Sequence, residues 1–336
     1  MLIVVPLLLS MSVSIRGQSD HQTFQLSSPT VVMPAPESEI FLVQPRDYTI
    51  GTGDTLYVVD ERGRLVHAFS LDGDHLFQFG GDGRGPGELR APRRIAQCDG
   101  RIFTLDVSLQ RINEYSSTGE FIRAITLNRN TYDIVVDQDY IYTSTSWFTG
   151  APVTRISRAS PDDRVPLLET ASQFFPEVEM GDFYSMGMRG GSIYLSIVDD
   201  QLIAVFRTVG VVAVLSTGQG SAEPRFIRLE HHLIDRYIRE FQKRLREYEG
   251  PGSITPSVVY EATPWPGGGL ACLIRTFDEQ EYEDVRLVLF DLETGTESGV
   301  VKTPDIIIST ISMIRPGLAA GIDSDSATIL LCTVRH

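Results

Sequence analysis

The sequence predicts an all-β protein, namely a six-bladed β-propeller made of four-stranded antiparallel blades. Three observations lead to this expectation. Residues 77–127 contain four short apolar segments separated by tight turns, which is the pattern of one antiparallel meander. The same order of segments recurs along the chain at intervals of about 40 to 50 residues, which is typical of propeller repeats. Only one convincing amphipathic helix interrupts them.

The strands of residues 77–127 can be assigned in order. The segment IAQC follows a glycine-rich turn, and Asp99-Gly100 leads into the segment RIFTLD. A loop leads to RINEYS, and Thr118-Gly119 then turns the chain into FIRAITL. Such polar pairs ending in glycine favour tight turns between antiparallel strands. This stretch is therefore expected to be one complete blade.

The residues before this blade repeat it. The segments LYVVD, RLVHAFS and HLFQFG match IFTLD, RINEYSS and FIRAIT, so Leu56 occupies the position in its repeat that Ile102 occupies in the next one. Four later segments carry a similar apolar position, which predicts six blades in total. The six positions are Leu56, Ile102, Ile141, Ile193, Leu270 and Leu318.

The interval from the fourth position, Ile193, to the fifth, Leu270, is much longer than the others. Its excess predicts an amphipathic helix over residues 229–249, where apolar side chains recur every three or four residues before Gly250 ends the helix. The C-terminal unit is one strand short. Residues 39–43 (EIFLV) are therefore expected to supply its outer strand and close the ring.

The start of the chain indicates export. Residues 1–15 are apolar, too short for a membrane-spanning helix, and typical of the apolar part of a secretory signal; a buried N-terminal strand is the alternative. The expected organisation is a signal-like segment over residues 1–18, a polar tether over 19–38 and one propeller domain over 39–336. The mature protein is expected to be a periplasmic or secreted monomer without a membrane span.

The net charge of −15 and the isoelectric point near 4.8 argue against a nucleic-acid partner, because binding phosphates requires clustered Lys and Arg. The glycine-rich stretch GGDGRGPGEL lacks the Gly-Lys-Ser/Thr ending of a phosphate-binding loop and is followed by strands, so it is expected to be a turn between blades. Asp60 and Asp106 end equivalent strands, and Arg64 and Arg111 follow them. This repetition predicts a structural cap or ion pair in each blade.

The second blade resembles an NHL repeat, a propeller blade with a characteristic order of glycines, an Asp-Gly turn and a strand ending in Asp. The resemblance is specific for this blade, partial for the one before it, and limited to strand spacing beyond Leu127. The matching residues are Gly81, Gly83, Gly85, Pro86, Gly87, Glu88, Leu89, Pro92, Ile95, Ala96, Asp99, Gly100, Arg101, Ile102, Phe103, Asp106, Arg111, Ile112, Tyr115, Gly119 and Phe121. Together with the helix and the signal-like start, the chain resembles bacterial extracytoplasmic six-bladed propellers of mostly unassigned function. That resemblance implies an exported binding or structural role.

Two sets of residues are candidates for binding. Residues just before each innermost strand are expected to line one mouth of the ring, the usual binding surface of a propeller, and they mix arginines, aromatics and acids. They are Arg46, Asp47, Arg93, Arg94, Tyr132, Asp133, Asp182 and Tyr184, and Tyr260 and Glu261 are additional candidates. The helix carries a basic face that could dock an acidic partner, made of Arg236, Arg239, Lys243 and Arg244.

The sequence favours a non-catalytic scaffold that binds a protein, peptide or glycan, because no catalytic constellation emerges. The alternative is a metal-dependent propeller enzyme of the lactonase or lyase kind, with carboxylates in the channel. No cofactor is expected, although a single calcium site formed by Asp47, Asp133 and Asp182 stays open. A third reading is a scaffold whose helix, rather than its ring, carries the interaction.

Overall fold

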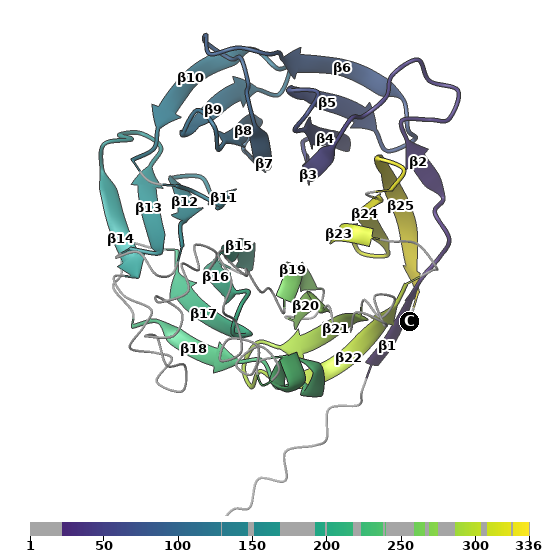
Figure 1. Cartoon of the computed structure of the whole chain (residues 1–336), viewed down its shortest axis with the longest axis vertical. Coiled ribbons are helices and arrows are strands. Elements are labelled where there is room, and N and C mark those ends of the chain that lie inside the picture. Colours follow the sequence, from purple (N-terminus) through teal and green to yellow (C-terminus); the bar gives the residue numbers. More distant parts are fainter. Residues whose placement is uncertain are drawn as a thin grey trace, which may run out of the picture.

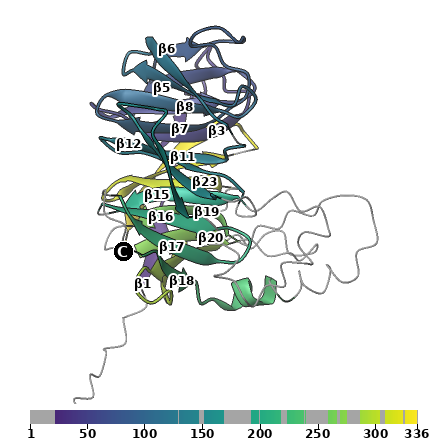
Figure 2. The same ribbon diagram turned by 90° about the vertical axis from the view of Figure 1, so that its left-hand side faces the viewer.

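The computed structural model describes residues 22–128, 130–146, 151–168, 192–198, 200–217, 223–237, 239, 259–265, 269–274, 286–303, 308–323 and 325–335. Within these residues the strands form six blades arranged radially around a central axis (Figure 1). The blades together form a disc when the molecule is seen from the side (Figure 2). The prediction of an all-β, six-bladed propeller is confirmed.

The first four blades are four-stranded and antiparallel, and each runs from the channel outward in chain order. Blade 1 is β3 (Pro45–Ile50), β4 (Thr55–Asp60), β5 (Leu65–Ser70) and β6 (His75–Gly80). Blade 2 is β7 (Pro92–Cys98), β8 (Arg101–Asp106), β9 (Arg111–Ser116) and β10 (Phe121–Thr126). Blade 3 is β11 (Asp133–Val136), β12 (Tyr140–Ser144), β13 (Val153–Ser157) and β14 (Arg164–Leu168). Blade 4 is β15 (Ile193–Val198), β16 (Gln201–Phe206), β17 (Val211–Ser216) and β18 (Arg225–Arg228).

Blades 5 and 6 are joined by the N-terminal strands. Blade 5 is β19 (Val259–Trp265), β20 (Gly269–Ile274), β21 (Arg286–Asp291) and β22 (Glu297–Lys302). Blade 6 is β23 (Ile308–Arg315), β24 (Leu318–Asp323) and β25 (Thr328–Arg335), with β2 (Val31–Met33) as its fourth strand. The remaining strand, β1 (Gln22–Leu26), pairs parallel with β22 and antiparallel with the end of β25.

The middle strands of each blade are buried on both faces, because each sheet packs between two neighbouring sheets. In blade 2, for example, all the residues of β8 after Arg101 are buried. The core is consequently divided into apolar layers between adjacent blades, such as the layer where Ile112 of blade 2 meets Ile141 and Ile156 of blade 3. This stacking explains why the strands are apolar runs rather than alternating patterns.

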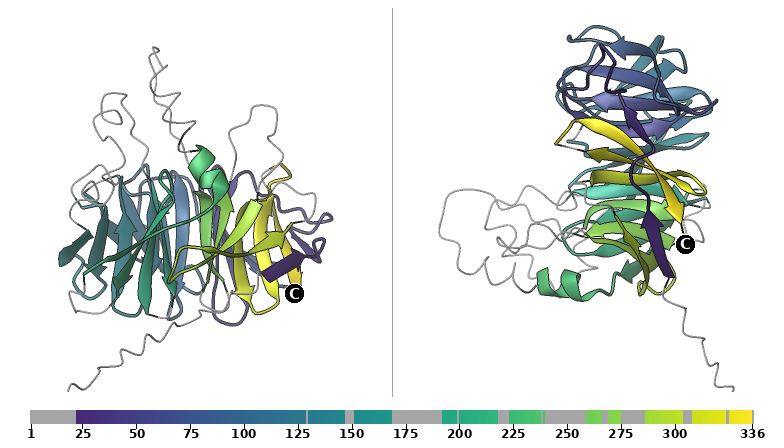
Figure 3. Two further views of the ribbon diagram at one scale, coloured as in Figure 1. Left: turned by 90° about the horizontal axis from the view of Figure 1, so that it is seen from below. Right: turned by 90° about the vertical axis from the view of Figure 1, so that its right-hand side faces the viewer.

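An N-terminal segment closes the ring, but it is not the predicted one. Residues 39–43 form no strand, because the backbone N–H groups of Val43 and Gln44 are bound by the Asp60 carboxylate at 2.6 and 2.8 Å and Phe41 is 74% exposed. The earlier strands β1 and β2 close the ring instead (Figure 3). The expected polar tether over residues 19–38 is therefore in part sheet, and its buried Leu26 and Met33 anchor it.

The fourth repeat position differs from the prediction by one strand. Ile193 lies in β15, the innermost strand of blade 4, whereas Leu56, Ile102 and the other predicted positions lie in second strands. The equivalent second-strand residue is Leu202 in β16, which pairs with β17 as β8 pairs with β9. The two positions are easily exchanged because β15 and β16 are adjacent apolar strands of similar length.

The inserted helix is confirmed over residues 232–237, which lie on one face of the disc (Figure 2). It begins three residues later than predicted, because residues 229–231 are not helical. Leu233 and Tyr237 are buried against the core between blades 4 and 5, as the apolar pattern predicted. The remainder of the predicted helix and the signal-like residues 1–18 lie outside the described residues. No helix within the described parts has the length and apolar character that crossing a bilayer requires.

The repeated aspartates are structural caps, as predicted, but they do not pair with the repeated arginines. The Asp106 carboxylate accepts backbone N–H groups on both sides, including those of Arg90 at 2.6 Å and Leu109 at 2.9 Å. Arg111 instead donates to backbone carbonyls of the preceding loop, including that of Glu88 at 2.7 Å. The caps thus tie each strand end to the loop that enters the same blade.

Candidate functional site at the channel

Each of the six innermost strands carries one residue at the same register position. The position is defined by pairing with the fifth residue of the second strand, as in the pair of Asp47 and Val59. We call this set the channel ring; its members are Asp47, Arg94, Asp133, Tyr194, Glu261 and Thr310. Figure 1 shows the strands that carry them, β3, β7, β11, β15, β19 and β23, arranged around the central axis of the ring.

A β-bulge precedes this position in blades 1, 2, 5 and 6. The pairing skips one residue just before Asp47, Arg94, Glu261 and Thr310. The skipped residue is left unpaired and the strand twists, which re-aims the next side chain. Proline begins the innermost strand in blades 1 and 2, and it is compatible with this geometry because it has no N–H group to donate to the ladder.

Arg94 lies between two carboxylates of the channel ring. Its Nη1 is 3.8 Å from Asp47 Oδ1, and its Nε is 3.2 Å from Asp133 Oδ1. The Nε contact is an ion pair without a hydrogen bond. The side chains of Arg94, Asp47 and Asp133 are only 14%, 17% and 8% exposed, so water screens these charges weakly.

Tyr194 extends this cluster across the channel. Its ring lies 4.8 Å from the guanidinium carbon of Arg94 and 4.5 Å from that of Arg207, within the usual range of cation–π contacts. Arg207 follows β16 and donates to the carbonyl of Val259 at 3.1 Å and to the hydroxyl of Ser192 at 2.8 Å. Two cations, one aromatic ring and the acids of the channel ring therefore share the same narrow space.

Two acids of the channel ring also form hydrogen bonds that join neighbouring blades. Asp47 Oδ2 accepts the backbone N–H of Ile95 at 2.9 Å, and Asp133 Oδ2 accepts that of Leu195 at 2.8 Å. In both cases the donor is the residue that follows a channel-ring position of the next blade. Asp47 and Asp133 are thus engaged by Arg94 and by backbone amides, which gives them a structural role.

The surroundings raise the pKa of all the acids of the channel ring. Burial raises the pKa of Asp47 to about 6, against the opposing charge of Arg94. Burial raises the pKa of Asp133 as well. Burial raises the pKa of Glu261 to about 7, with the negative charges of Asp47 and Asp133 adding to the effect. Glu261 therefore titrates near neutral pH.

Glu261 differs from the other two acids in its contacts. Within the described residues its carboxylate makes neither a hydrogen bond nor an ion pair, although Arg94 and Arg207 attract it from a distance. The residue as a whole is half-buried and so keeps contact with solvent. Removing a charged carboxylate from water costs free energy unless a cation or hydrogen-bond donor pairs with it. Because Glu261 has no such direct partner in the described part of the chain, it is the acid of the channel ring that can accept an added cation.

The predicted arginines at the mouth are held by one acid. Arg46 contacts Glu61, and Arg93 Nη2 lies 3.1 Å from the other oxygen of the same carboxylate. The arginine side chains are 43% and 45% exposed while Glu61 is 13% exposed. Although burial opposes it, the hydrogen bonds from both arginines hold the pKa of Glu61 below its usual value. This contact joins the innermost strands of blades 1 and 2 at the rim.

The other predicted site residues are dispersed or fall outside the described residues. Tyr132 lies at the start of blade 3 and is half-buried. Arg236 and Arg239 are exposed on the helix side away from the core. Those outside the described residues are Asp182, Tyr184, Lys243 and Arg244, and nothing is described of the Tyr260 side chain.

Sequence reasoning missed Tyr194 and Arg207. Both follow from reading the SIYLSI segment as an innermost strand, which places Tyr194 at the channel ring and Arg207 just beyond the next strand. The long interval from Ile141 to Leu202 leaves room for that assignment. Glu261, one of the candidates at the mouth, does lie at a channel-ring position.

The described residues contain no group of three or more His, Cys, Asp or Glu side chains suited to hold a metal ion. The calcium site that the sequence left open also meets a specific obstacle, because the Arg94 guanidinium lies between Asp47 and Asp133. The third ligand considered for that site, Asp182, lies outside the described residues. A cation of the protein itself thus already balances the two carboxylates.

Comparisons with known proteins agree with the fold. A family model described as a 6-bladed beta-propeller matches residues 41–151, about a third of the chain. Fold, blade count and this match together define the class of the chain as a six-bladed β-propeller. No curated protein matches the sequence.

Three solved structures with similar folds share little sequence identity with this chain. A putative exported protein from Bacteroides fragilis shares 11% identity at a TM-score of 0.59, covering 93% of this chain and 95% of that one. A protein of unknown function from Bacteroides thetaiotaomicron shares 9% at 0.56, with 89% and 71% covered. A catalytically inactive virginiamycin B lyase from Staphylococcus aureus, with quinupristin, shares 10% at 0.52, with 91% and 87% covered. At such identities the likeness concerns the fold alone.

Proposed function

We propose that this protein is an exported, non-catalytic β-propeller that binds a protein or peptide partner at the channel mouth. A positively charged side chain of the partner enters the channel and pairs with Glu261. The single observation that carries this proposal is that Glu261 is the acid of the channel ring without a direct partner among the described residues. Arg94 and backbone amides already engage Asp47 and Asp133.

The rim supports a partner of mixed charge. Arg46 and Arg93 remain nearly half exposed even though Glu61 holds them, so they can contact acidic or carbonyl groups beside the entering cation. Arginines and aromatic rings are the residue types that contribute most to binding at protein interfaces. Export is supported by the apolar residues 1–15 of the sequence and by the likeness to an exported Bacteroides protein.

The test compares two pools of acetylated heptapeptides with random flanks, one with a central lysine and one with a central norleucine. The wild type is expected to bind the lysine pool at least about tenfold more tightly, the ratio that an ion pair worth about 1.4 kcal/mol supplies. Glu261→Gln keeps the shape of the side chain and should remove this preference. Fluorescence anisotropy of labelled pools measures both affinities.

Asp54→Asn is the matched control, because Asp54 lies in the turn between β3 and β4 and is 63% exposed. This variant should keep the preference for lysine. Equal binding of the two pools by the wild type, or a preference that survives in Glu261→Gln, would contradict the proposal. Circular dichroism of each variant establishes that the comparison is made between folded proteins.

A further inference from the structure

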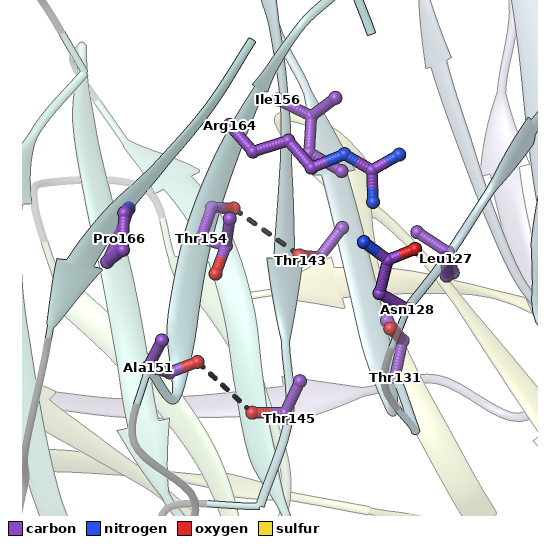
Figure 4. A pocket seen from close by; sticks show the side chains of 10 residues that line it. All are labelled: Leu127, Asn128, Thr131, Thr143, Thr145, Ala151, Thr154, Ile156, Arg164 and Pro166. Carbon is purple, nitrogen blue, oxygen red and sulfur yellow. Dashed lines mark hydrogen bonds between the residues drawn. The ribbon is translucent and has the colours of Figure 1, made fainter. Parts of the chain in front are cut away.

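A cavity of about 190 Å³ lies between blades 2 and 3, separate from the channel ring. Its polar wall is made by Asn128, Thr131, Thr143, Thr145, Thr154 and Arg164, and Leu127, Ile156 and Pro166 supply apolar contacts (Figure 4). We call it the inter-blade cavity. It is far larger than the roughly 10–15 Å³ that one water molecule needs and smaller than the roughly 300 Å³ at which drug-sized pockets begin.

The cavity exists because a loop that fills the preceding interface has no counterpart here. The loop between β6 and β7 runs over residues 81–91, whereas the loop between β10 and β11 runs over residues 127–132 and is about half as long. The longer loop packs into the interface between blades 1 and 2. Its Gly87 carbonyl accepts the Tyr115 hydroxyl at 2.9 Å, its Glu88 carbonyl accepts the Asn113 amide at 3.2 Å, and its Leu89 is fully buried.

Blade 3 presents smaller side chains at the positions that this loop contacts in blade 2. Thr154 pairs with Thr143 as Asn113 pairs with Thr104, so Thr154 occupies the position of Asn113. By the same register, Ile156 occupies the position of Tyr115. A shorter loop and smaller side chains together leave the space open, and much of its lining is polar.

The acid that caps the strand end in blade 2 is also replaced. Asp106 accepts several backbone N–H groups there, whereas the residue after β12 is Thr145, whose hydroxyl donates to the Ala151 carbonyl at 3.2 Å. The described lining of the cavity therefore contains no carboxylate.

Arg164 is the one charged side chain of the described lining. Its Nε donates to the Pro161 carbonyl at 2.9 Å, and its Nη2 donates to the Thr126 carbonyl of blade 2 at 2.7 Å. These two bonds fix the guanidinium across the interface without neutralising it, and the described residues place no acid within ion-pair distance. Figure 4 shows the guanidinium directed toward the side of the cavity where Asn128 lies.

The threonine hydroxyl groups of the lining provide further hydrogen-bonding positions for a ligand. Thr143 donates its hydroxyl to the Thr154 carbonyl at 3.4 Å, which leaves the oxygen able to accept a hydrogen bond from a ligand. Within the described residues the Thr154 hydroxyl itself makes no hydrogen bond. A ligand that suits this lining has hydroxyl groups, some apolar C–H surface and one negative charge. A single guanidinium matches one planar carboxylate, whereas phosphate usually gathers several donors or cations.

We propose that the inter-blade cavity binds one carboxylate-bearing sugar residue, with the carboxylate on Arg164 and the ring hydroxyls on the threonines and Asn128. The site is independent of Glu261 and of the channel mouth. The protein would then hold a saccharide where blades 2 and 3 meet, in addition to the partner proposed for the channel.

The test uses glucuronate, glucose and acetate as probes in saturation-transfer NMR titrations of the full chain. Glucuronate should bind, and glucose and acetate should each bind at least about tenfold more weakly. Glucose lacks the carboxylate that pairs with Arg164, and acetate lacks the ring hydroxyls that the threonines and Asn128 bind. Arg164→Gln should abolish the preference for glucuronate over glucose. Arg155→Gln is the control, because Arg155 lies on the same blade against the Tyr140 ring and does not line the cavity.

A second variant, Thr154→Leu, fills the cavity while keeping Arg164, and it should also abolish glucuronate binding. The Glu261→Gln protein should bind glucuronate as the wild type does, which separates this site from the channel. The absence of glucuronate binding to the wild type, an equal response to glucose, or binding that persists in both cavity variants would overturn the proposal.

Discussion

Replacing Arg94 with methionine tests whether this cation balances the acids of the channel. Methionine keeps much of the length of the side chain and removes the charge, so Asp47 and Asp133 are left facing each other with exposures of only 17% and 8%. Removing one partner of a buried ion pair costs about 3–5 kcal/mol. Against a total stability of about 5–15 kcal/mol for an ordinary domain, this is a large loss.

The loss should depend on pH in a definite direction. The pKa of Asp47 is already raised from 3.8 to about 6, so the folded protein retains a proton that the unfolded chain has released. Such a group stabilises the fold below the unfolded pKa, and that contribution disappears as the pH rises through the folded pKa. Without Arg94 the pKa values of Asp47 and Asp133 rise further, because the opposing charge is gone. The Arg94→Met variant should therefore lose about 3–5 kcal/mol at pH 7.5 and less than about 1 kcal/mol at pH 4.5.

Urea unfolding followed by circular dichroism at the two pH values measures this difference relative to the wild type at the same pH. Arg90→Met is the matched control, since Arg90 is 42% exposed and its ion pair with Asp82 spans 3.5 Å at the surface. It should change stability by no more than about 0.5 kcal/mol at either pH. An equal loss at both pH values for Arg94→Met, or a loss no larger than that of the control, would refute the electrostatic reasoning.

Three further predictions follow from other parts of the structure. Met33→Ala should lower the unfolding free energy by about 2–5 kcal/mol, because Met33 is fully buried in the closing strand β2. Phe41→Ala, at a 74% exposed position, should change it by less than about 0.5 kcal/mol. Equal effects of the two substitutions in urea unfolding would contradict closure of the ring by β2. Burial lowers the pKa of His67 from 6.5 to about 4, so as the pH falls the unfolded chain takes up this proton before the folded protein does. Between pH 7 and pH 4 the unfolding free energy of the wild type should therefore fall by about 3 kcal/mol more than that of His67→Leu. Equal decreases in the two proteins would contradict this reasoning. With a Glu261 pKa of about 7, ionisation falls from about 90% at pH 8 to about 10% at pH 6. If the ionised form binds the lysine pool about tenfold more tightly than the neutral form, binding of this pool should weaken about fivefold over this range, and an affinity independent of pH would exclude Glu261 as the anion.

The sequence was sufficient for the blade architecture because turns and strand lengths are local properties. Gly100 and Gly119 have positive φ in the tight turns that the Asp-Gly and Thr-Gly pairs predicted, and glycine adopts such angles without steric cost. The four strands of residues 77–127 follow directly from these turns. The channel positions of Asp47, Arg94 and Asp133 were also reachable, since each lies at the start of an innermost strand.

What the sequence missed depends on pairing between distant segments. The closing strand β2 is only three residues long in a polar context, and nothing local distinguishes it from EIFLV until its pairing with β25 is known. Tyr194 was missed because two adjacent apolar strands of blade 4 could each have been the second strand. The inter-blade cavity depends on the length of a loop relative to its counterpart one blade earlier, which becomes meaningful only once the register of Thr154 is fixed.

The position of β2 also bears on how the chain can fold. Val31 pairs with Leu331, so nearly the whole length of the chain separates the two partners, and the first described strands must wait for the last before the ring is complete. Contacts this distant in sequence slow folding, and until they form, the edge of β25 is open to pairing with another chain. The outer edge of blade 6, where β2 pairs with β25, is thus expected to form last. A circular permutant that joins residue 335 to residue 22 would make this pairing local and should refold faster.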